Sequence, residues 1–135
     1  MKNSVTKSSV MKKVKEFKCK GYNCLIVETT NPITNWLCAY VFLPEYTHFY
    51  KNHTKENPDY FERCETKFNK WFYNNVPYCT WVDLIEDELC IGLDLCHYWN
   101  VESGTTNDTN LAENQLKEMV DSIIDNREEI KELTK

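Results

Sequence analysis

The sequence predicts a single α+β domain in which two helices pack on one antiparallel sheet of about four strands. Three observations lead to this fold class. The chain has 135 residues, enough for one core, and 41% of them are hydrophobic. Runs of β-forming residues come in pairs separated by turn signals. Two other segments repeat apolar residues at helical spacing.

The first two predicted strands form a hairpin. Residues 22–30 are rich in β-forming side chains, and Asn31-Pro32 ends the run. Residues 36–43 are apolar at both odd and even positions, which predicts a central strand covered on both sides. Pro44 closes that strand because proline cannot donate to a ladder.

A helix is predicted after an irregular aromatic loop over residues 45–56. Asn57 is a suitable N-cap and Pro58 a suitable first helical residue. The helix is expected over 58–74 and ends before Pro77. Its apolar residues recur at helical spacing: Tyr60, Phe61, Cys64, Phe68, Trp71 and Phe72.

Two further strands and a last helix complete the predicted domain. Residues 78–85 and 89–96 flank an acidic turn at 86–88 and form a second hairpin. A capping signal at Asp108 or Thr109 predicts a helix over 110–133. Its apolar stripe is expected to pack on the core: Ala112, Leu116, Met119, Val120, Ile123, Ile124 and Ile130.

The fourth predicted strand carries an unexpected carboxylate. Alternation in a strand places Ile91 and Leu93 on one face and Asp94 on the other. A carboxylate in an apolar strand needs donors, a cation or water, because an unpaired buried charge is costly. Asp94 therefore marks either a structural hydrogen-bond network or a site.

Two interpretations of Asp94 stay open. In the structural one, it accepts hydrogen bonds from backbone amides, from Thr80 or from tyrosine hydroxyls, while His97 ends the strand. In the other, Asp94 and His97 bind a small polar ligand, such as a nucleotide signal, between flat aromatic walls. The predicted ligand-binding residues are Tyr40, His48, Thr80, Trp81, Asp94, His97 and Trp99.

A metal-dependent hydrolase is a further alternative. The ends of two strands could bring His48, Asp94 and His97 to one rim, and two histidines with a carboxylate can hold a divalent metal. The spacing matches no rigid ligand motif, and the chain has no glycine-rich phosphate loop. Cys96 is a poor nucleophile partner for His97, since adjacent strand residues point apart. We therefore expect no cofactor, no resident metal and no catalytic residue.

The seven cysteines are predicted to be mostly small core residues rather than disulfides or metal ligands. No pair has the C-x2-C spacing of a zinc or redox motif. Four of them lie in apolar strand-like runs: Cys24, Cys38, Cys79 and Cys90. We expect them to be reduced in the cytoplasm of a bacterial host.

Charge is unevenly distributed along the chain, with a net value of -5. Lysines are concentrated before residue 21, and residues 1–16 are predicted to be a solvated, flexible leader that precedes the domain over 17–135. The chain after this lysine-rich start lacks the basic face of a nucleic-acid-binding protein and the long apolar run of a membrane span. We therefore expect it to bind neither nucleic acid directly nor a membrane. The predicted partner-binding residues are acidic: Glu86, Asp87, Glu88, Asp121, Asp125 and Glu128.

Four spaced motifs resemble those of a family of small uncharacterised proteins from bacteriophages and prophages. The family blocks are K-G-Y-x-C, C-G-Y-V-x-V-P-x-x-H-P-x-Y, H-G-G-L-T-[FY] and W-[WI]-G-F-D-C-A-H. Residues 20–24, 38–50 and 91–97 match the first, second and fourth blocks. Residues 76–81 keep only the threonine and an aromatic residue of the third.

The resemblance implies a phage accessory protein, a class in which inhibitors of bacterial defence are common. Loss of the third block's histidine and glycines favours binding a protein over a shared pocket chemistry. We therefore expect a non-enzymatic, anti-CRISPR-like inhibitor. Its acidic surface would bind the basic surface of a bacterial defence protein, for example the nucleic-acid-binding surface of an effector.

Overall fold

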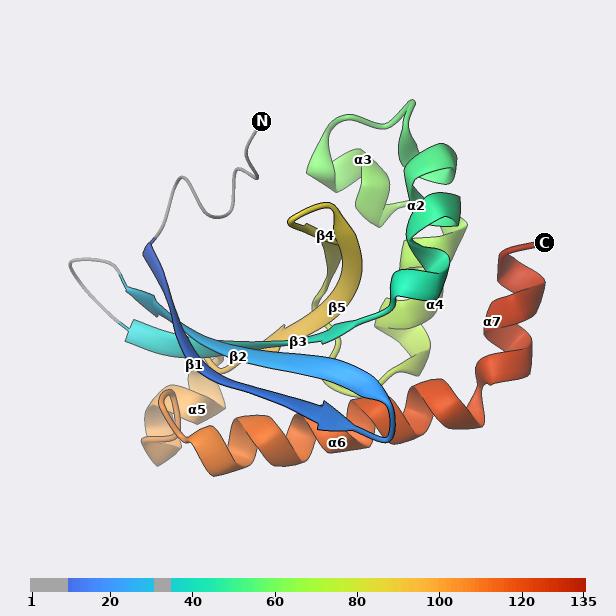
Figure 1. The fold of residues 1–135 in the computed structure, drawn as a ribbon. Coiled ribbons are helices and arrows are strands. Elements are labelled where there is room, and N and C mark those ends of the chain that lie inside the picture. The colour runs from blue at the N-terminus through green and yellow to red at the C-terminus, as the bar shows by residue number, and fades with distance from the viewer. Residues whose placement is uncertain (1–9, 31–34) are drawn as a thin grey trace.

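A five-stranded antiparallel sheet with helices packed against it forms one small domain, so the predicted α+β class is confirmed (Figure 1). The computed structural model describes residues 10–30 and 35–135. The strands are β1 (Val10–Cys19), β2 (Tyr22–Thr30), β3 (Asn35–Phe42), β4 (Trp81–Ile85) and β5 (Glu88–Asp94). The helices are η1 (Pro44–Tyr46), α2 (Thr47–Thr54), α3 (Tyr60–Cys64), α4 (Lys67–Asn75), α5 (Tyr98–Ser103), α6 (Thr109–Asp125) and α7 (Arg127–Leu133).

The sheet order is β1-β2-β3-β5-β4, with every neighbouring pair antiparallel. Both predicted hairpins are confirmed as β2–β3 and β4–β5. In the central pair, Cys38 lies opposite Asp94 and Phe42 lies opposite Cys90. The C-terminal ends of β3 and β5 therefore point to opposite ends of the sheet.

Strand β1 is the element that the sequence pattern did not predict. Residues 10–16, expected to belong to a flexible leader, pair with β2, while residues 1–9 lie outside the described residues. Most β1 side chains between residues 12 and 18 are exposed and several are lysines, so the run shows no apolar periodicity. Charged side chains of this kind are typical of an edge strand, where they discourage pairing with another chain.

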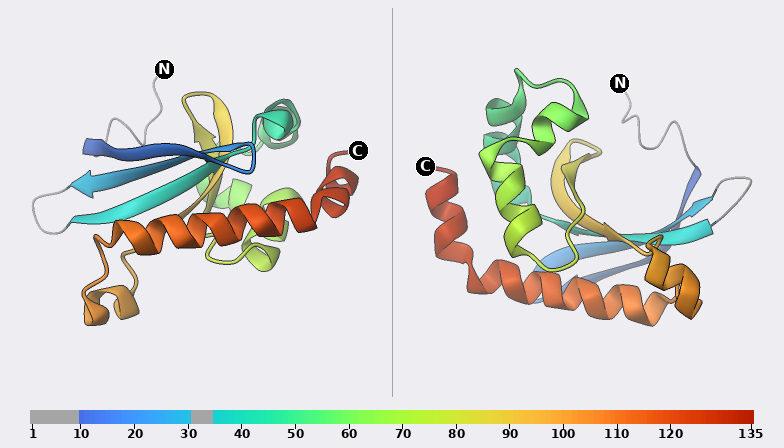
Figure 2. Two further views of the ribbon diagram at one scale, coloured as in Figure 1. Left: turned by 60° about the horizontal axis from the view of Figure 1, so that its bottom comes forward. Right: turned by 180° about the vertical axis from the view of Figure 1, so that it is seen from behind.

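Helix α6 runs along one face of the sheet (Figure 2), and the larger of two apolar clusters joins that face to side chains of α6 and of η1, α2, α4 and α7. Leu116, Met119 and Ile123 of α6 are buried there against Ile26 and Ala39 of the sheet. The predicted apolar stripe is thus confirmed as core packing. Burial of this kind contributes roughly 1.5–3 kcal/mol per large aliphatic side chain.

A second, smaller cluster lies on the opposite face of the sheet. It contains Val27, Tyr40, Ile85 and Cys90, so β3 is buried on both faces as predicted. The β4–β5 hairpin curls out of the plane of the other strands and makes this face concave (Figure 1). That curled hairpin, rather than a helix, supplies part of the cover.

The helices are more divided than predicted. The expected loop over 45–56 is η1 followed by α2. The expected helix over 58–74 is two helices, because Thr66 starts a new one by accepting a hydrogen bond from the Asn69 backbone N–H. Propensity and periodicity locate such helices, but a local cap can divide them.

The helices in the last third of the chain are also more divided than predicted. Helix α5 was not predicted, and Gly104 ends it in a left-handed conformation with φ of 71°. Asp108 is the N-cap of α6, since its Oδ1 accepts from the Leu111 backbone N–H. The predicted helix over 110–133 is interrupted at Asn126, which separates α6 from α7. Within the described part of the chain, no helix has the length and apolar character needed to cross a bilayer.

Candidate functional site

A cavity of about 270 Å³ lies at the C-terminal end of β5, against the start of α5. It brings together four of the predicted ligand-binding residues: Thr80, Asp94, His97 and Trp99. Thr80 immediately precedes β4, Asp94 ends β5, and the other two belong to the chain that turns into α5. The antiparallel pairing of β4 with β5 is what places Thr80 beside Asp94.

The Asp94 carboxylate already has protein donors. Its Oδ2 accepts a hydrogen bond from Thr80 Oγ1 at 3.0 Å. Its Oδ1 accepts from the Cys96 backbone N–H at 3.2 Å and from Cys96 Sγ at 2.7 Å. These are the contacts of the structural interpretation, in which a threonine hydroxyl and a backbone amide satisfy the carboxylate. The side chain nevertheless keeps 24% of its surface exposed.

His97 connects the carboxylate to an aromatic wall. Its Nε2 lies 3.5 Å from Asp94 Oδ1, and its ring stacks on Trp99 with centroids 4.5 Å apart. As the N-cap residue of α5, it donates its backbone N–H to Asn100 Oδ1 at 3.2 Å. The helix start therefore fixes both the ring and the carboxylate at one side of the cavity.

The other walls were not identified from the sequence. Tyr73 of α4, Tyr78 before β4, Asn100 of α5 and Gln115 of α6 also line the cavity. Tyr78 has a positive φ of 66°, a conformation that sequence periodicity does not reveal in a tyrosine. Since these residues come from four separate segments, only the tertiary structure brings them together.

Tyr40 and Trp81 lie elsewhere, in the second apolar cluster. Their rings meet edge to face with centroids 5.4 Å apart. Tyr40 covers Gly92, where an added Cβ would lie 2.6 Å from the tyrosine Cδ1. Both aromatic residues support the concave face of the sheet rather than the walls of the cavity.

His48 does not approach Asp94 and His97, which corrects the expected common rim. It lies on α2, after the C-terminal end of β3, and contacts Asn52. Because β3 and β5 are antiparallel, α2 and the end of β5 extend from opposite ends of the sheet. Among the described residues, no group of three or more His, Cys, Asp or Glu side chains could hold a metal ion.

The thiol beside Asp94 is held in its neutral form. Burial, and then the hydrogen bond to the Asp94 carboxylate, raise the pKa of Cys96 to about 12. A thiolate rather than a thiol is the usual nucleophile. All seven cysteines are free, and Cys24, Cys79 and Cys90 are buried as predicted for core residues.

The first predicted acidic group lies at the tight turn between β4 and β5, with Glu86 and Asp87 in the turn and Glu88 as the first residue of β5. Glu86 and Asp87 have positive φ values of 49° and 71°, as in a two-residue hairpin turn. Asp87, with 77% of its side chain exposed, forms an ion pair with Lys51 of α2 at 2.6 Å. Glu86 and Glu88 carry no ion pair to any residue that the structure describes.

The second predicted acidic group lies where α6 passes into α7. Asp121 forms an exposed ion pair with Lys20 at 2.6 Å, and Glu128 lies 3.5 Å from Lys131. Asp125 is exposed in the last turn of α6. Neighbouring lysines therefore partly offset the charge of this group.

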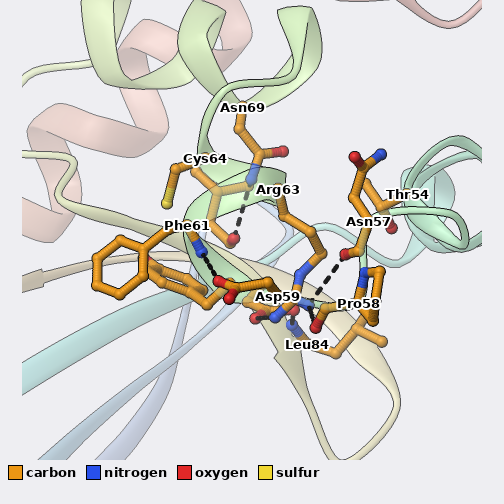
Figure 3. Close-up of polar contacts among 12 residues, drawn as sticks. Thr54, Asn57, Pro58, Asp59, Phe61, Arg63, Cys64, Asn69 and Leu84 are labelled. Atoms are coloured by element: carbon orange, nitrogen blue, oxygen red, sulfur yellow. Dashed lines mark hydrogen bonds and ion pairs between the residues drawn. The ribbon is translucent and has the colours of Figure 1, made fainter.

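A polar cluster around Arg63 was not predicted (Figure 3). Arg63 donates to the carbonyl oxygens of Asn57 and Pro58 and forms an ion pair with Asp83 of β4. Asp83 Oδ1 also accepts from the Tyr50 hydroxyl at 3.1 Å and from the Leu84 backbone N–H at 2.8 Å. The cluster ties α2, α3 and β4 together, which is a structural function.

Comparisons with protein-family models, with curated proteins and with solved structures gave no match to this chain. The resemblance to phage proteins therefore stays a prediction that rests on the quoted motifs.

Proposed function

We propose that this chain is a phage or mobile-element accessory protein that acts by binding, and that it inhibits a bacterial defence complex through its acidic surface. The observation that carries the proposal is the β4–β5 turn, which presents Glu86, Asp87 and Glu88 in consecutive positions on a tight hairpin. Two of these carboxylates are not neutralised by any described residue. An anionic, rigidly held projection suits a basic surface on a partner.

The surface between α6 and α7 supports the same proposal more weakly. Asp121, Asp125 and Glu128 are exposed there, but two of the three have lysine partners. Exposed ion pairs of this kind contribute little, about 0–1 kcal/mol, so a cationic partner can replace the lysines. We therefore assign the turn the larger effect on binding and the helix junction the smaller one.

The proposal is tested by plaque assays on bacterial strains that each carry one defence system. The parent chain should restore plaque formation on at least one strain. The variant Glu86→Gln/Asp87→Asn/Glu88→Gln should restore it less, and Asp121→Asn/Asp125→Asn/Glu128→Gln should have a smaller effect. Both variants should melt close to the parent temperature, because five of the six residues are exposed and the half-buried Glu88 has no ion pair among the described residues. Such substitutions usually change stability by about 0.5 kcal/mol or less. Full activity of both triple variants would contradict the charge-based mechanism.

A small-ligand function is a second candidate, supported by the cavity at the end of β5. Thr80, Asp94, His97 and Trp99 combine polar groups with an aromatic wall in one concave site. Such a site suits a flat polar ligand, for example a nucleobase, that stacks on the indole and donates to the carboxylate. Native mass spectrometry of protein purified from bacteria tests this alternative directly. A bound small molecule that is lost in Asp94→Asn, with an unchanged melting temperature, would support it.

A further inference from the structure

The concave face of the sheet contains a groove of about 490 Å³ beside the β4–β5 turn. Glu86 and Glu88 form one side, while Glu16 and Lys18 of β1 form the other. Phe42 and Ile85, both packed in the second apolar cluster, contribute to its floor. The register places Glu16 opposite Leu25 and Leu25 opposite Tyr40, so this side of β1 faces the same way as that cluster.

The groove has an excess of negative charge, with three carboxylates and one lysine. Glu16 lies 3.1 Å from Lys13, but more than half of each side chain is exposed, so the pair is well screened. Glu86 and Glu88 have no such partner among the described residues. A cation that enters the groove would therefore meet carboxylates that are free to accept hydrogen bonds.

The three consecutive acidic side chains at the turn do not all face the groove. Glu86 and Glu88 line the groove, whereas Asp87 is absent from its walls and reaches Lys51 on α2. The left-handed conformations of Glu86 and Asp87 enforce this division, because they reverse the chain within two residues. The acids that face the groove can therefore be changed independently of the one that does not.

We propose that this groove binds an arginine- or lysine-bearing segment of a partner protein. The aliphatic stems would lie on Phe42 and Ile85, and the charged ends would meet Glu86 and Glu88. An apolar floor with an acidic rim is complementary to such side chains, and the same rim repels phosphate groups. The inference rests on the proposed function, for which it specifies the contact site and the chemistry of the partner.

Nuclear magnetic resonance titrations of the full chain test the groove with three synthetic peptides. The probe alternates arginine and leucine over six residues, one control replaces leucine by serine, and another replaces arginine by glutamate. The probe should shift backbone amides at 16–18, 23–25, 42 and 85–88. The serine peptide keeps the arginine stems but loses the leucine contacts to the floor, so it should bind more weakly, and the glutamate peptide, which lacks the cationic ends, should not bind.

A matched pair of variants separates a local site from a general charge effect. Glu86→Gln/Glu88→Gln should raise the probe's Kd about tenfold, or about 1.4 kcal/mol. Glu62→Gln/Glu102→Gln removes the same charge from exposed residues of α3 and α5, outside the groove, and should change Kd about twofold or less. Equal effects of the two double variants, or amide shifts outside the groove, would overturn the proposed site.

Plaque assays with the same variants distinguish this inference from the proposed function. If the probe binds in the groove but the parent chain restores plaque formation on no strain, the groove is supported as a binding site and the inhibitor function is contradicted. If Glu86→Gln/Glu88→Gln restores plaque formation as well as the parent chain does, the inhibitor function is supported and the groove is contradicted as its contact site.

Discussion

The contact between Asp94 and Cys96 makes one exposed cysteine chemically unlike an ordinary surface thiol. Cys96 is exposed as a residue, yet burial of the sulfur and the Asp94 carboxylate raise its pKa to about 12. The thiolate fraction at neutral pH is therefore far smaller than for a thiol at the reference pKa of 9.0. This contact explains how a carboxylate in an apolar strand is satisfied without a ligand.

We predict slow alkylation of Cys96 between pH 7 and pH 9, with a rate that rises toward pH 12. Asp94→Asn removes the carboxylate that stabilises the neutral thiol, so it should lower the pKa and speed alkylation. Iodoacetamide labelling at several pH values, followed by peptide mass spectrometry, measures the Cys96 rate separately from the other cysteines. Fast labelling of the parent at pH 7.5 would show that the thiol is not held neutral.

Gly92 is required because of what lies above it rather than because of its backbone angles. A Cβ at this position would lie 2.6 Å from the Tyr40 ring and 3.1 Å from the Ala39 carbonyl oxygen. The ring is buried, so it has little room to move. The aromatic residue and the glycine therefore act as one packing unit.

Gly92→Ala is expected to destabilise the fold by about 1–3 kcal/mol through overpacking. Tyr40→Leu removes the clashing ring atoms and should recover part of the loss when combined with Gly92→Ala. Urea unfolding of both single variants and the double variant gives the coupling energy. Strictly additive changes would mean that Tyr40 does not press on Gly92.

At the scale of elements, α3 depends on polar contacts more than on buried side chains: those of Arg63, and those of Tyr60 and Cys64 with the Tyr73 hydroxyl of α4. The structure buries no residue of this helix, and Phe61 is largely exposed. Its Arg63 side chain, with 18% of its surface exposed, pairs with Asp83, which is 16% exposed. The ion pair and the two carbonyl contacts therefore attach α3 and the preceding loop to β4.

Arg63→Ala should cost about 3 kcal/mol, because it leaves the Asp83 carboxylate with only part of its hydrogen bonds. The double variant Arg63→Met/Asp83→Leu removes both charges and should be more stable than the sum of the single changes predicts. Urea unfolding measures each variant, and amide exchange of residues 58–64 reports whether α3 detaches. Unchanged exchange in Arg63→Ala would show that other contacts hold the helix.

For the whole molecule, the cysteines make stability sensitive to high pH. Burial raises the pKa of Cys24 and Cys79 to about 12, above their reference value of 9.0. A group whose pKa is raised by folding stabilises the native state below its unfolded pKa. That contribution is lost as the pH rises through the folded pKa.

We therefore expect the free energy of unfolding to fall between pH 9 and pH 12. Burial also raises the pKa of Tyr40 and Tyr50, so these tyrosines add to the same trend. Urea midpoints measured from pH 7 upward test this dependence. Cys24→Ala/Cys79→Ala should flatten the early part of the curve, although it lowers stability at pH 7 by leaving small voids. A parent midpoint that stays constant to pH 11 would contradict the prediction.

Local patterns in the sequence determined much of the fold. Apolar runs and turn residues located β2, β3 and the β4–β5 hairpin, and the helical stripe located α6, because these elements bury apolar side chains on at least one face. Strand β1 was not predicted because most of its side chains, lysines included, are exposed, while Met11, Phe17 and Cys19, which pack against the apolar clusters, form no regular alternation. Helix α5 was not predicted because a six-residue helix with exposed aromatic residues has no apolar periodicity.

The residues of the candidate site were identified partly from the sequence and partly from the tertiary structure. The sequence alone singled out Asp94 and His97, since a carboxylate within an apolar strand requires partners. Only the tertiary structure decided which residues join them. Strand order brought Thr80 to Asp94 and sent His48 to the opposite end of the sheet. Strand order depends on contacts between residues far apart in the chain, which no local pattern records.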